Sequence, residues 1–407
     1  MTDMTAVQRD RGRIAAVVEV FLAFLRLGLT SFGGPVAHLG YFHEAFVVRR
    51  RWLSDRAYAD VVALCQFLPG PASSQVGMAL GLQRAGFAGM LAAWVAFTLP
   101  SAVLLVLFAV AITAVAGVVE GGWIIGLKAA AVAVVAQAVI SMARTLTPDR
   151  RRATLAAAAA IAALLAPNAA LQVAAIAVAG VIGLLWLHDE APAAEGTDQP
   201  FSVRVPRAVA ITCLLAYGSL LAVVLLGAGV LRSGPPQLFA IFYRAGALVF
   251  GGGHVVLPLL ESQTVRTGLV GHDAFLAGYG AAQAVPGPLF TFAAFLGAVN
   301  DGSPAGVGGA AIALIAIFLP GALLVVGALP FWLSLRRLRR VRRAVMGINA
   351  GVVGLLAAAL YSPVFTEGIT SPTALAVAVA AFVALAKWRV PPWAVVIAAG
   401  ILGAVLL

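Results

Sequence analysis

Two stretches of this 407-residue chain place a Pro-Gly-Pro break inside apolar sequence: Gln66–Pro71 (QFLPGP) and Gln283–Pro288 (QAVPGP). Proline lacks the N–H that a helix interior needs and glycine favours non-helical backbone, so helices are expected to stop at both places. The apolar segments beside the first break, 57–68 and 72–84, are each about a dozen residues, or about 18 Å of helix. Both are shorter than the ~30 Å hydrocarbon core of a bilayer.

The landmarks around the two breaks recur in the same order, which indicates an internal repeat. The paired landmarks are Phe24–Gly28 (FLRLG) with Phe242–Gly246 (FYRAG), Phe32-Gly33-Gly34 with Phe250-Gly251-Gly252, Glu44 with Glu261, and Leu99-Pro100 with Leu319-Pro320. The offset between partners is nearly constant. Both halves of the chain are therefore expected to share one plan.

The composition is that of a membrane protein. Of the residues, 62% are hydrophobic and only 11% are charged, whereas an average soluble domain has roughly 25% charged residues. A cytosolic enzyme, a disordered chain and a secreted disulfide scaffold are therefore excluded, and Cys65 and Cys213 suit neither a disulfide nor a metal site. The length allows about a dozen spans. We interpret 14–32 as the first span and not as a signal peptide, because it contains Glu19 and Arg26 and lacks a cleavage site.

The net charge of +11 comes largely from short arginine clusters beside apolar segments. Such clusters mark cytoplasmic loops, and no aromatic-rich basic face accompanies them, so no nucleic-acid partner is predicted. In the first half a basic cluster (150–152) follows the apolar segment 123–142, whereas in the second half the cluster 336–343 precedes the corresponding segment 343–360. Equivalent loops are therefore expected on opposite sides of the membrane.

These patterns predict an all-α polytopic membrane protein with two inverted-topology repeats that contain Gly/Pro-broken helices or re-entrant hairpins. The expected organisation is an N-terminal transporter repeat (1–188), a polar linker (189–206), an extra transmembrane span (207–230) and a C-terminal inverted repeat (231–407). The extra span changes the parity and so allows the inversion. This is the usual plan of secondary transporters, with the substrate near the midplane. Ordinary kinked spans are the alternative to hairpins.

The breaks also predict an anion-binding site. A helix that starts inside the membrane directs unpaired N–H groups and about half a positive charge toward the centre. Ser73, Ser74 and Gln75 follow the first Pro-Gly-Pro break, and Thr291 follows the second, which adds neutral donors. A small divalent oxyanion suits such a set of donors, and a metal ion does not.

Two arginines add positive charge to this prediction. Arg26 and Arg244 each precede a Phe-Gly-Gly motif by six residues. An arginine within a membrane segment usually marks a substrate pathway or a paired structural charge. For Arg26 the structural alternative is a salt bridge with Glu19, seven residues earlier.

The candidate site consists of the breaks and the polar side chains beside them. The predicted substrate-binding residues are Arg26, Ser31, Gly33, Gly34, His38, Gln66, Pro69, Gly70, Pro71, Ser73, Ser74, Gln75, Arg244, Gly251, Gly252, Gly253, His254, Gln283, Pro286, Gly287, Pro288 and Thr291. Glu44 and Glu261 are candidates for a coupling proton, with capping or pairing to a nearby arginine as the alternative. A histidine beside a break is more often a hydrogen-bonded structural residue than a ligand. No catalytic, metal or nucleotide motif occurs, so no cofactor is predicted.

Together the motifs resemble the chromate ion transporter family in its long two-domain form. The first signature comprises Phe24–Pro35 (FLRLGLTSFGGP), Arg51-Trp52-Leu53 and Phe67–Pro71 (FLPGP). The second comprises Phe250–His254 (FGGGH), Leu257–Glu261 (LPLLE) and Val285–Pro288 (VPGP). The resemblance covers both halves, although Arg26 stands where lysine is also common and His254 where the family varies.

The resemblance implies export of chromate from the cytoplasm across the bacterial inner membrane, which confers resistance, with sulfate as a competing or related substrate. The chain would be a multi-pass protein of the lipid bilayer with a cytoplasmic N-terminus. Both a monomer and a homodimer are compatible with the resemblance. A sulfate or other oxyanion permease is the alternative in the same class. A membrane-embedded enzyme acting on a lipid or quinone is the alternative in another class, but it needs a titratable cluster near one interface and none stands out.

Overall fold

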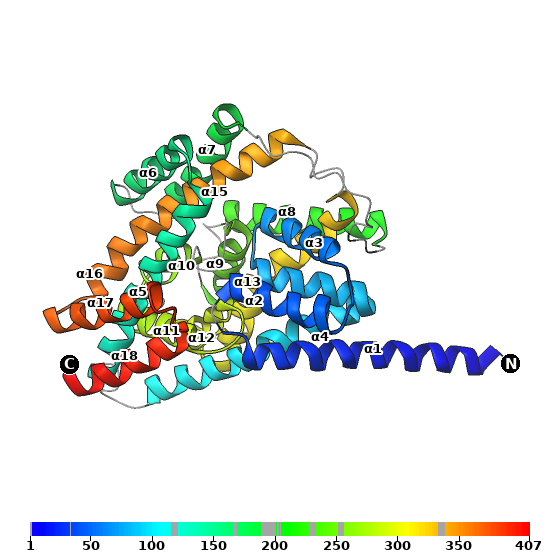
Figure 1. Ribbon diagram of the computed structural model, residues 1–407, viewed down its shortest axis with the longest axis horizontal. Coiled ribbons are helices and arrows are strands. Elements are labelled where there is room, and N and C mark those ends of the chain that lie inside the picture. The colour runs from blue at the N-terminus through cyan, green and yellow to red at the C-terminus, as the bar shows by residue number, and fades with distance from the viewer. Residues whose placement is uncertain are drawn as a thin grey trace.

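The computed structural model describes residues 2–32, 34–114, 121–165, 169–188, 201, 203, 205–227, 233–250, 256–332 and 338–407. Every regular element within these residues is a helix, and no strand occurs among them. Figure 1 shows the helices packed into one body, with the N-terminal end of α1 projecting on one side and the C-terminus on the opposite side. The predicted all-α fold of a polytopic membrane protein is confirmed by these helices and their apolar composition.

The helices follow the repeat. The first half contains α1 (Thr2–Thr30), α2 (Gly34–Phe42), the π-helix η1 (His43–Arg49), α3 (Asp55–Phe67), α4 (Ala72–Ala114), α5 (Gly122–Leu146), α6 (Arg150–Leu165) and α7 (Ala169–Trp186). The extra helix α8 (Arg207–Leu226) precedes the second half. The second half contains α9 (Gly234–Leu248), α10 (Val256–Thr264), α11 (His272–Ala284), η5 (Leu289–Thr291), α12 (Phe292–Val299), α13 (Gly306–Ala328), η6 (Leu329–Phe331), α15 (Arg339–Ala359), η7 (Leu360–Phe365), α16 (Thr366–Gly368), α17 (Pro372–Ala386) and α18 (Pro392–Leu406).

Only some of the described helices are long and apolar enough to cross a membrane on their own. Five stretches are long and apolar enough: Ala72–Ala114, Gly122–Leu146, Arg207–Leu226, Gly306–Phe331 and Arg339–Gly368. The first of these contains a kink at Ala85 and Gly86, where Gly86 has a φ of +67°, so a short helix precedes a long one. The described residues therefore hold fewer full-length spans than the dozen or so that the chain length allows.

The short helices around the first Pro-Gly-Pro break fold back as a hairpin. Trp52 precedes α3, and Arg84 ends the short part of α4. The Arg84 guanidinium lies 5.4 Å from the Trp52 ring centroid. Both side chains donate to the Glu19 carboxylate of α1, Arg84 at 2.8 Å and Trp52 at 3.2 Å. The outer ends of the two helices therefore lie on one side of the protein, and the break forms the tip of a hairpin.

The second Pro-Gly-Pro break has the same arrangement. The Asp301 N–H, just after α12, donates to the Leu269 carbonyl, just before α11, at 2.9 Å. The outer ends of α11 and α12 are therefore neighbours as well. Both breaks therefore have the geometry of helical hairpins.

The end of α1 forms another hairpin with α2 and η1. The Phe24 ring of α1 stacks on Phe46 with 4.8 Å between centroids, and it meets the edge of Phe42 at 5.4 Å. All three rings are fully buried. Burial of this aromatic surface holds α1 against the returning helix, with the turn at Ser31 and Phe32.

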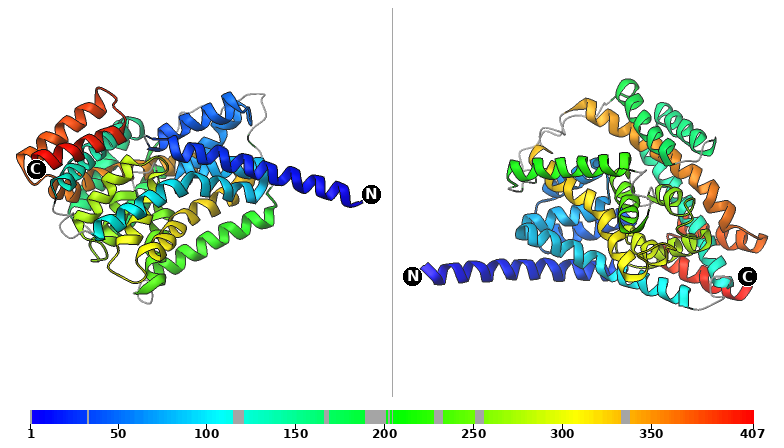
Figure 2. Two further views of the ribbon diagram at one scale, coloured as in Figure 1. Left: turned by 90° about the horizontal axis from the view of Figure 1, so that it is seen from below. Right: turned by 180° about the vertical axis from the view of Figure 1, so that it is seen from behind.

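The two halves exchange their last helices. The helices α6 and α7 of the first half pack on α15 of the second half. The helices α17 and α18 of the second half pack on α5 of the first half (Figures 1 and 2). Small residues permit the close approach: a Cβ on Gly126 of α5 would lie 2.1 Å from the Ala399 carbonyl of α18. At the equivalent crossing a Cβ on Gly183 of α7 would lie 2.6 Å from the Gly347 Cα of α15. Backbone contact between helices through small residues is typical of membrane proteins.

The repeat-related helices α5 and α15 run in opposite directions. Arg151, just after α5, donates to the Trp186 carbonyl at 3.0 Å, and Arg343, in the first turns of α15, donates to the Leu185 carbonyl at 3.1 Å. Both carbonyls belong to the end of α7. The basic end of α5 and the basic start of α15 therefore lie on the same side of the protein.

We expect Gly126→Ala to lower the thermal stability of the purified protein, because the new Cβ must push α18 away from α5. Overpacking of this kind costs about 1–3 kcal/mol. Gly218→Ala in α8 is the matched control, since nothing lies within 4 Å of a Cβ there. Thermal unfolding in detergent should show a lower midpoint for Gly126→Ala only. Equal midpoints for both variants would contradict the packing described for α5 and α18.

Candidate functional site

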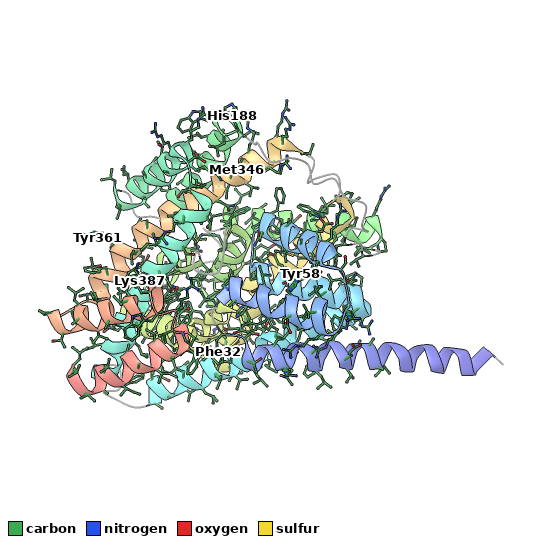
Figure 3. The ribbon with its side chains drawn as sticks, viewed as in Figure 1. Phe32, Tyr58, His188, Met346, Tyr361 and Lys387 are labelled. Atoms are coloured by element: carbon green, nitrogen blue, oxygen red, sulfur yellow. The ribbon has the colours of Figure 1, made fainter. Side chains whose placement is uncertain are left out.

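The breaks of one half are hydrogen-bonded to the breaks of the other. The Gly70 N–H donates to the Val249 carbonyl, just before the second Phe-Gly-Gly motif, at 2.7 Å. In the equivalent contact the Gly287 N–H donates to the Ser31 carbonyl, just before the first such motif, at 2.9 Å. Figure 3 labels Phe32, the neighbour of Ser31, at the inner end of α1. The tips of hairpins from both halves therefore meet in one place.

Gly70 and Gly287 are required by backbone conformation and by space. Their φ angles are +123° and +103°, which L side chains rarely adopt. A Cβ on Gly70 would lie 3.3 Å from the Gly321 Cα of α13, and a Cβ on Gly287 would lie 2.8 Å from the Ser101 Oγ of α4. Gly321 and Ser101 each follow the Leu-Pro pair of equivalent helices. Each tip therefore packs on the long helix of the opposite half.

Buried polar atoms with no hydrogen-bond partner among the described residues gather around these tips. We call them the tip cluster: Ser31 Oγ, His38 Nε2, Ser74 Oγ, Gln75 Oε1, Thr98 Oγ1 and Gln283 Nε2. None of the six side chains is more than 8% exposed. An unpaired buried polar group costs about 1–3 kcal/mol. A group of such atoms in one place is a candidate site for a polar ligand.

Other predicted polar residues hold the tips in shape. The Gln75 Nε2 donates to the Pro69 carbonyl at 2.9 Å, which links the first turn of α4 to the break. The Thr291 Oγ1 donates to the Pro288 carbonyl at 2.7 Å, and the Ser73 Oγ lies 3.4 Å from the His38 Nδ1. These bonds leave the hydroxyl oxygen lone pairs and the second His38 nitrogen available.

The remaining predicted residues fall into three groups. Gly34, Pro69, Pro71, Pro286 and Pro288 belong to the tips themselves. Gln66 is exposed on α3, whereas its repeat partner Gln283 is buried. Gly33, Gly251, Gly252, Gly253 and His254 lie outside the described residues.

Arg26 and Arg244 have different surroundings although their sequence positions are equivalent. Arg26 is exposed and lines a cavity of about 150 Å³ beside η1. Arg244 is half-buried and donates to the Val224 carbonyl of α8 at 2.7 Å. The salt bridge with Glu19, which was the structural alternative for Arg26, does not form. The hairpin brings Arg84 and Trp52 to the Glu19 carboxylate instead.

Glu44 and Glu261 both form ion pairs with an arginine five residues later. The Arg49 Nε lies 2.8 Å from the Glu44 Oε1, and the Arg266 Nε lies 3.4 Å from the Glu261 Oε1. Their environments differ, since the Glu44 side chain is 51% exposed and the Glu261 side chain is 4% exposed. Pairing with arginine is the alternative that the sequence allowed for both carboxylates, and a role in proton coupling stays a prediction.

Two polar features escape the sequence reasoning. Ser101 follows the proline of α4 and lies at the Gly287 tip, and its hydroxyl donates to the Thr98 carbonyl at 3.0 Å. The sequence signal of both residues is their place beside the repeated Leu-Pro pair. Lys128, buried in α5, forms an ion pair with Asp273 in the first turn of α11. This pair joins the two halves. Its only sequence signal is a lone cation in an apolar segment, which is usually functional or paired.

A helical membrane protein whose two halves bring hairpin tips to a donor-lined centre has the architecture of a secondary transporter. The chain belongs to the chromate transporter family, which matches residues 18–184 and again residues 236–404. The two matches lie one in each half. The family resemblance expected from the motifs is confirmed.

Individual relatives agree with this assignment. A chromate transport protein of Pseudomonas aeruginosa is 30% identical over 347 residues, which cover 84% of this chain and 79% of the relative. A probable chromate transport protein of Synechococcus elongatus is 28% identical, with 83% and 82% covered, and a chromate transport protein of Cupriavidus metallidurans is 26% identical, with 88% and 85% covered. No solved structure matches the chain.

We expect Gly70→Ala and Gly287→Ala to abolish most chromate transport while the protein still inserts in the membrane. Each substitution strains the backbone at a positive φ, at a cost of about 1–3 kcal/mol, and displaces a tip from the opposite half. Gly86→Ala is the matched control, because its φ is also positive, at +67°, but nothing lies within 4 Å of its Cβ. Transport into membrane vesicles, normalised to protein abundance, tests this. Loss of protein rather than of transport would instead assign the glycines to packing alone.

Proposed function

We propose that the chain is a secondary transporter that exports chromate from the cytoplasm across the inner membrane and so confers chromate resistance. The observation that carries the proposal is the tip cluster, a buried set of unpaired polar atoms in a chromate transporter family member. Sulfate, which is also a tetrahedral dianion, is proposed as a competing substrate.

The tips offer a dianion the groups that it needs. α4 begins directly after the first Pro-Gly-Pro break, and its first turn contributes Ser73, Ser74 and Gln75. Helix starts at the tips each supply about half a positive charge and unpaired N–H groups. Hydroxyl groups such as those of Ser31 and Thr98 replace water around the oxyanion, which offsets part of its desolvation. Arg26 and Arg244 are proposed to raise the local concentration of the anion on the way to the tips.

Elementary electrostatics favours export over uptake. With the cell interior negative, one charge crossing the membrane is worth about 2.3 kcal/mol per 100 mV, so a departing dianion gains about 4.6 kcal/mol. Export therefore needs no coupling ion. Glu44 and Glu261 each have an arginine partner, and export of a dianion down the membrane potential requires no proton from either.

We expect chromate efflux from proteoliposomes to be driven by the membrane potential alone. Vesicles loaded with chromate and given a K⁺ diffusion potential, negative inside, should lose chromate faster than vesicles without a potential. Collapse of a pH gradient should leave the rate unchanged, and external sulfate should compete only from the side to which the site is open. Efflux that follows the pH gradient and ignores the potential would contradict uncoupled export and restore Glu44 and Glu261 as proton carriers.

We also propose that the two repeats have opposite orientations, with the N-terminus in the cytoplasm. The antiparallel course of α5 and α15 supports this, as does the placement of their basic ends on one side through Arg151 and Arg343. Figure 1 also has α2 and α3 on one side of the centre and α10, α11 and α12 on the other.

The orientation is tested with single cysteines in a variant lacking Cys65 and Cys213. We expect an impermeant maleimide to label Arg150→Cys and Arg340→Cys only from the cytoplasm, because both positions lie at basic helix ends. Gly121→Cys, at the opposite end of α5, should be labelled only from outside. Labelling of the Arg150 and Gly121 positions from the same side would refute the topology.

A further inference from the structure

A small basic cavity lies beside the first hairpin. Its volume is about 150 Å³, and Arg26 of α1 lines it together with Tyr41 of α2, Glu44 and Arg49 of η1, and Arg50. We call it the Arg26 cavity. Its other walls come from the apolar residues Ala23, Leu27 and Ala45 and from Thr30, whose hydroxyl donates to the Arg26 carbonyl at 2.7 Å. Low-dielectric walls around charges of one sign strengthen the local field and attract counter-ions.

The charges of the Arg26 cavity are unbalanced. Glu44 pairs with Arg49 at 2.8 Å, which neutralises one arginine. Arg26 and Arg50 have no carboxylate within ion-pair distance among the described residues. Arg50 makes only a long bond of 3.5 Å to the Ala45 carbonyl and a contact of 5.8 Å to the Phe46 ring. Two positive charges are therefore left over, which equals the charge of one chromate or sulfate dianion.

The second half provides an internal comparison. An equivalent cavity of about 140 Å³ is lined by Pro258, Glu261 and Arg266, which correspond to Tyr41, Glu44 and Arg49 in the repeat. Its one carboxylate and one guanidinium balance, and apolar residues of α6 and α15 take the place of further arginines. The excess charge is thus a property of the first half and not of the repeated hairpin.

We propose that the Arg26 cavity is a capture site that binds a tetrahedral oxyanion before it reaches the tips. The inference rests on the proposed function, since it names the residues at which the exported anion first binds. Arg26 is five residues before Ser31, whose carbonyl holds the Gly287 tip, so the site adjoins the central cluster along α1. Two guanidinium groups can each offer a pair of parallel N–H donors to the oxygens of one anion.

Equilibrium binding of chromate, and separately of sulfate, to the full-length protein in nanodiscs of zwitterionic lipid tests the site. We expect Arg26→Gln and Arg50→Gln each to weaken binding about tenfold, because each removes a charge-assisted contact. Arg50→Lys keeps the charge and should lose less. High salt should reduce the difference between the wild type and the Gln variants.

Arg152→Gln is the matched control, since it removes one positive charge in the first turn of α6, far along the chain from Arg26. There the backbone N–H and the guanidinium of Arg152 bind Asp149 and hold the pKa of that carboxyl below its usual value. Its affinity for chromate should equal that of the wild type. Equal affinity in all variants, each eluting as a single species in gel filtration, would overturn the capture site.

A phosphate headgroup is the other source of the same chemistry. The binding measurement is therefore repeated in nanodiscs containing phosphatidylglycerol. If chromate affinity is unaffected by Arg26→Gln and Arg50→Gln while both variants lose stabilisation by phosphatidylglycerol, the cavity binds lipid and the proposal is wrong. If the wild type binds chromate at this cavity but does not transport it, the proposed function is refuted and the capture site stands. If the wild type transports chromate and the variants bind it as tightly as the wild type does, the capture site is refuted and the proposed function stands.

Discussion

Inside a membrane no water is available to bind a backbone group that leaves a helix, so every interruption must be paired within the protein. Here the pairing is reciprocal: the Gly70 N–H binds the Val249 carbonyl, and the Gly287 N–H binds the Ser31 carbonyl. Each half supplies the partner that the other half lacks. Neither set of broken helices could be stable in the bilayer alone, and the meeting of the tips therefore fixes how the halves assemble.

The same reciprocity extends outward from the tips. Gly70 packs on α13 and Gly287 packs on α4, while α6 and α7 cover α15 and α17 and α18 cover α5. A displacement of one tip must therefore be accompanied by movement of the long helix of the opposite half. Such a linked pair of halves is the physical requirement for moving a central anion from one side to the other.

The sequence predicts the local features and misses the long-range ones. Proline and glycine mark where helices stop, and composition and repeated motifs identify the membrane class and the family, because those signals lie within a few neighbouring residues. The partners of Glu19 and the Lys128–Asp273 pair depend on how hairpins and halves pack. The fold places Arg84 next to Glu19 from 65 residues away, so spacing along α1 alone favoured the nearer Arg26. The unequal surroundings of Arg26 and Arg244 likewise depend on α8, whose Val224 carbonyl accepts a hydrogen bond from Arg244.

The Glu–Arg pair occurs in both halves, but it is exposed to solvent in the first half and its carboxylate is buried in the second. The exposed Glu44–Arg49 pair is screened by solvent, and such pairs contribute about 0–1 kcal/mol. The Glu261 carboxylate is almost fully buried, and removing the partner of a buried charge is far more destabilising. Arg49 can therefore leave its carboxylate for a passing anion at little expense, whereas Arg266 cannot. Together with the unpaired Arg26 and Arg50, this makes the first-half side of the protein the one that attracts anions. Under the proposed function, the anion would bind first on this side and leave where the equivalent hairpin is neutral.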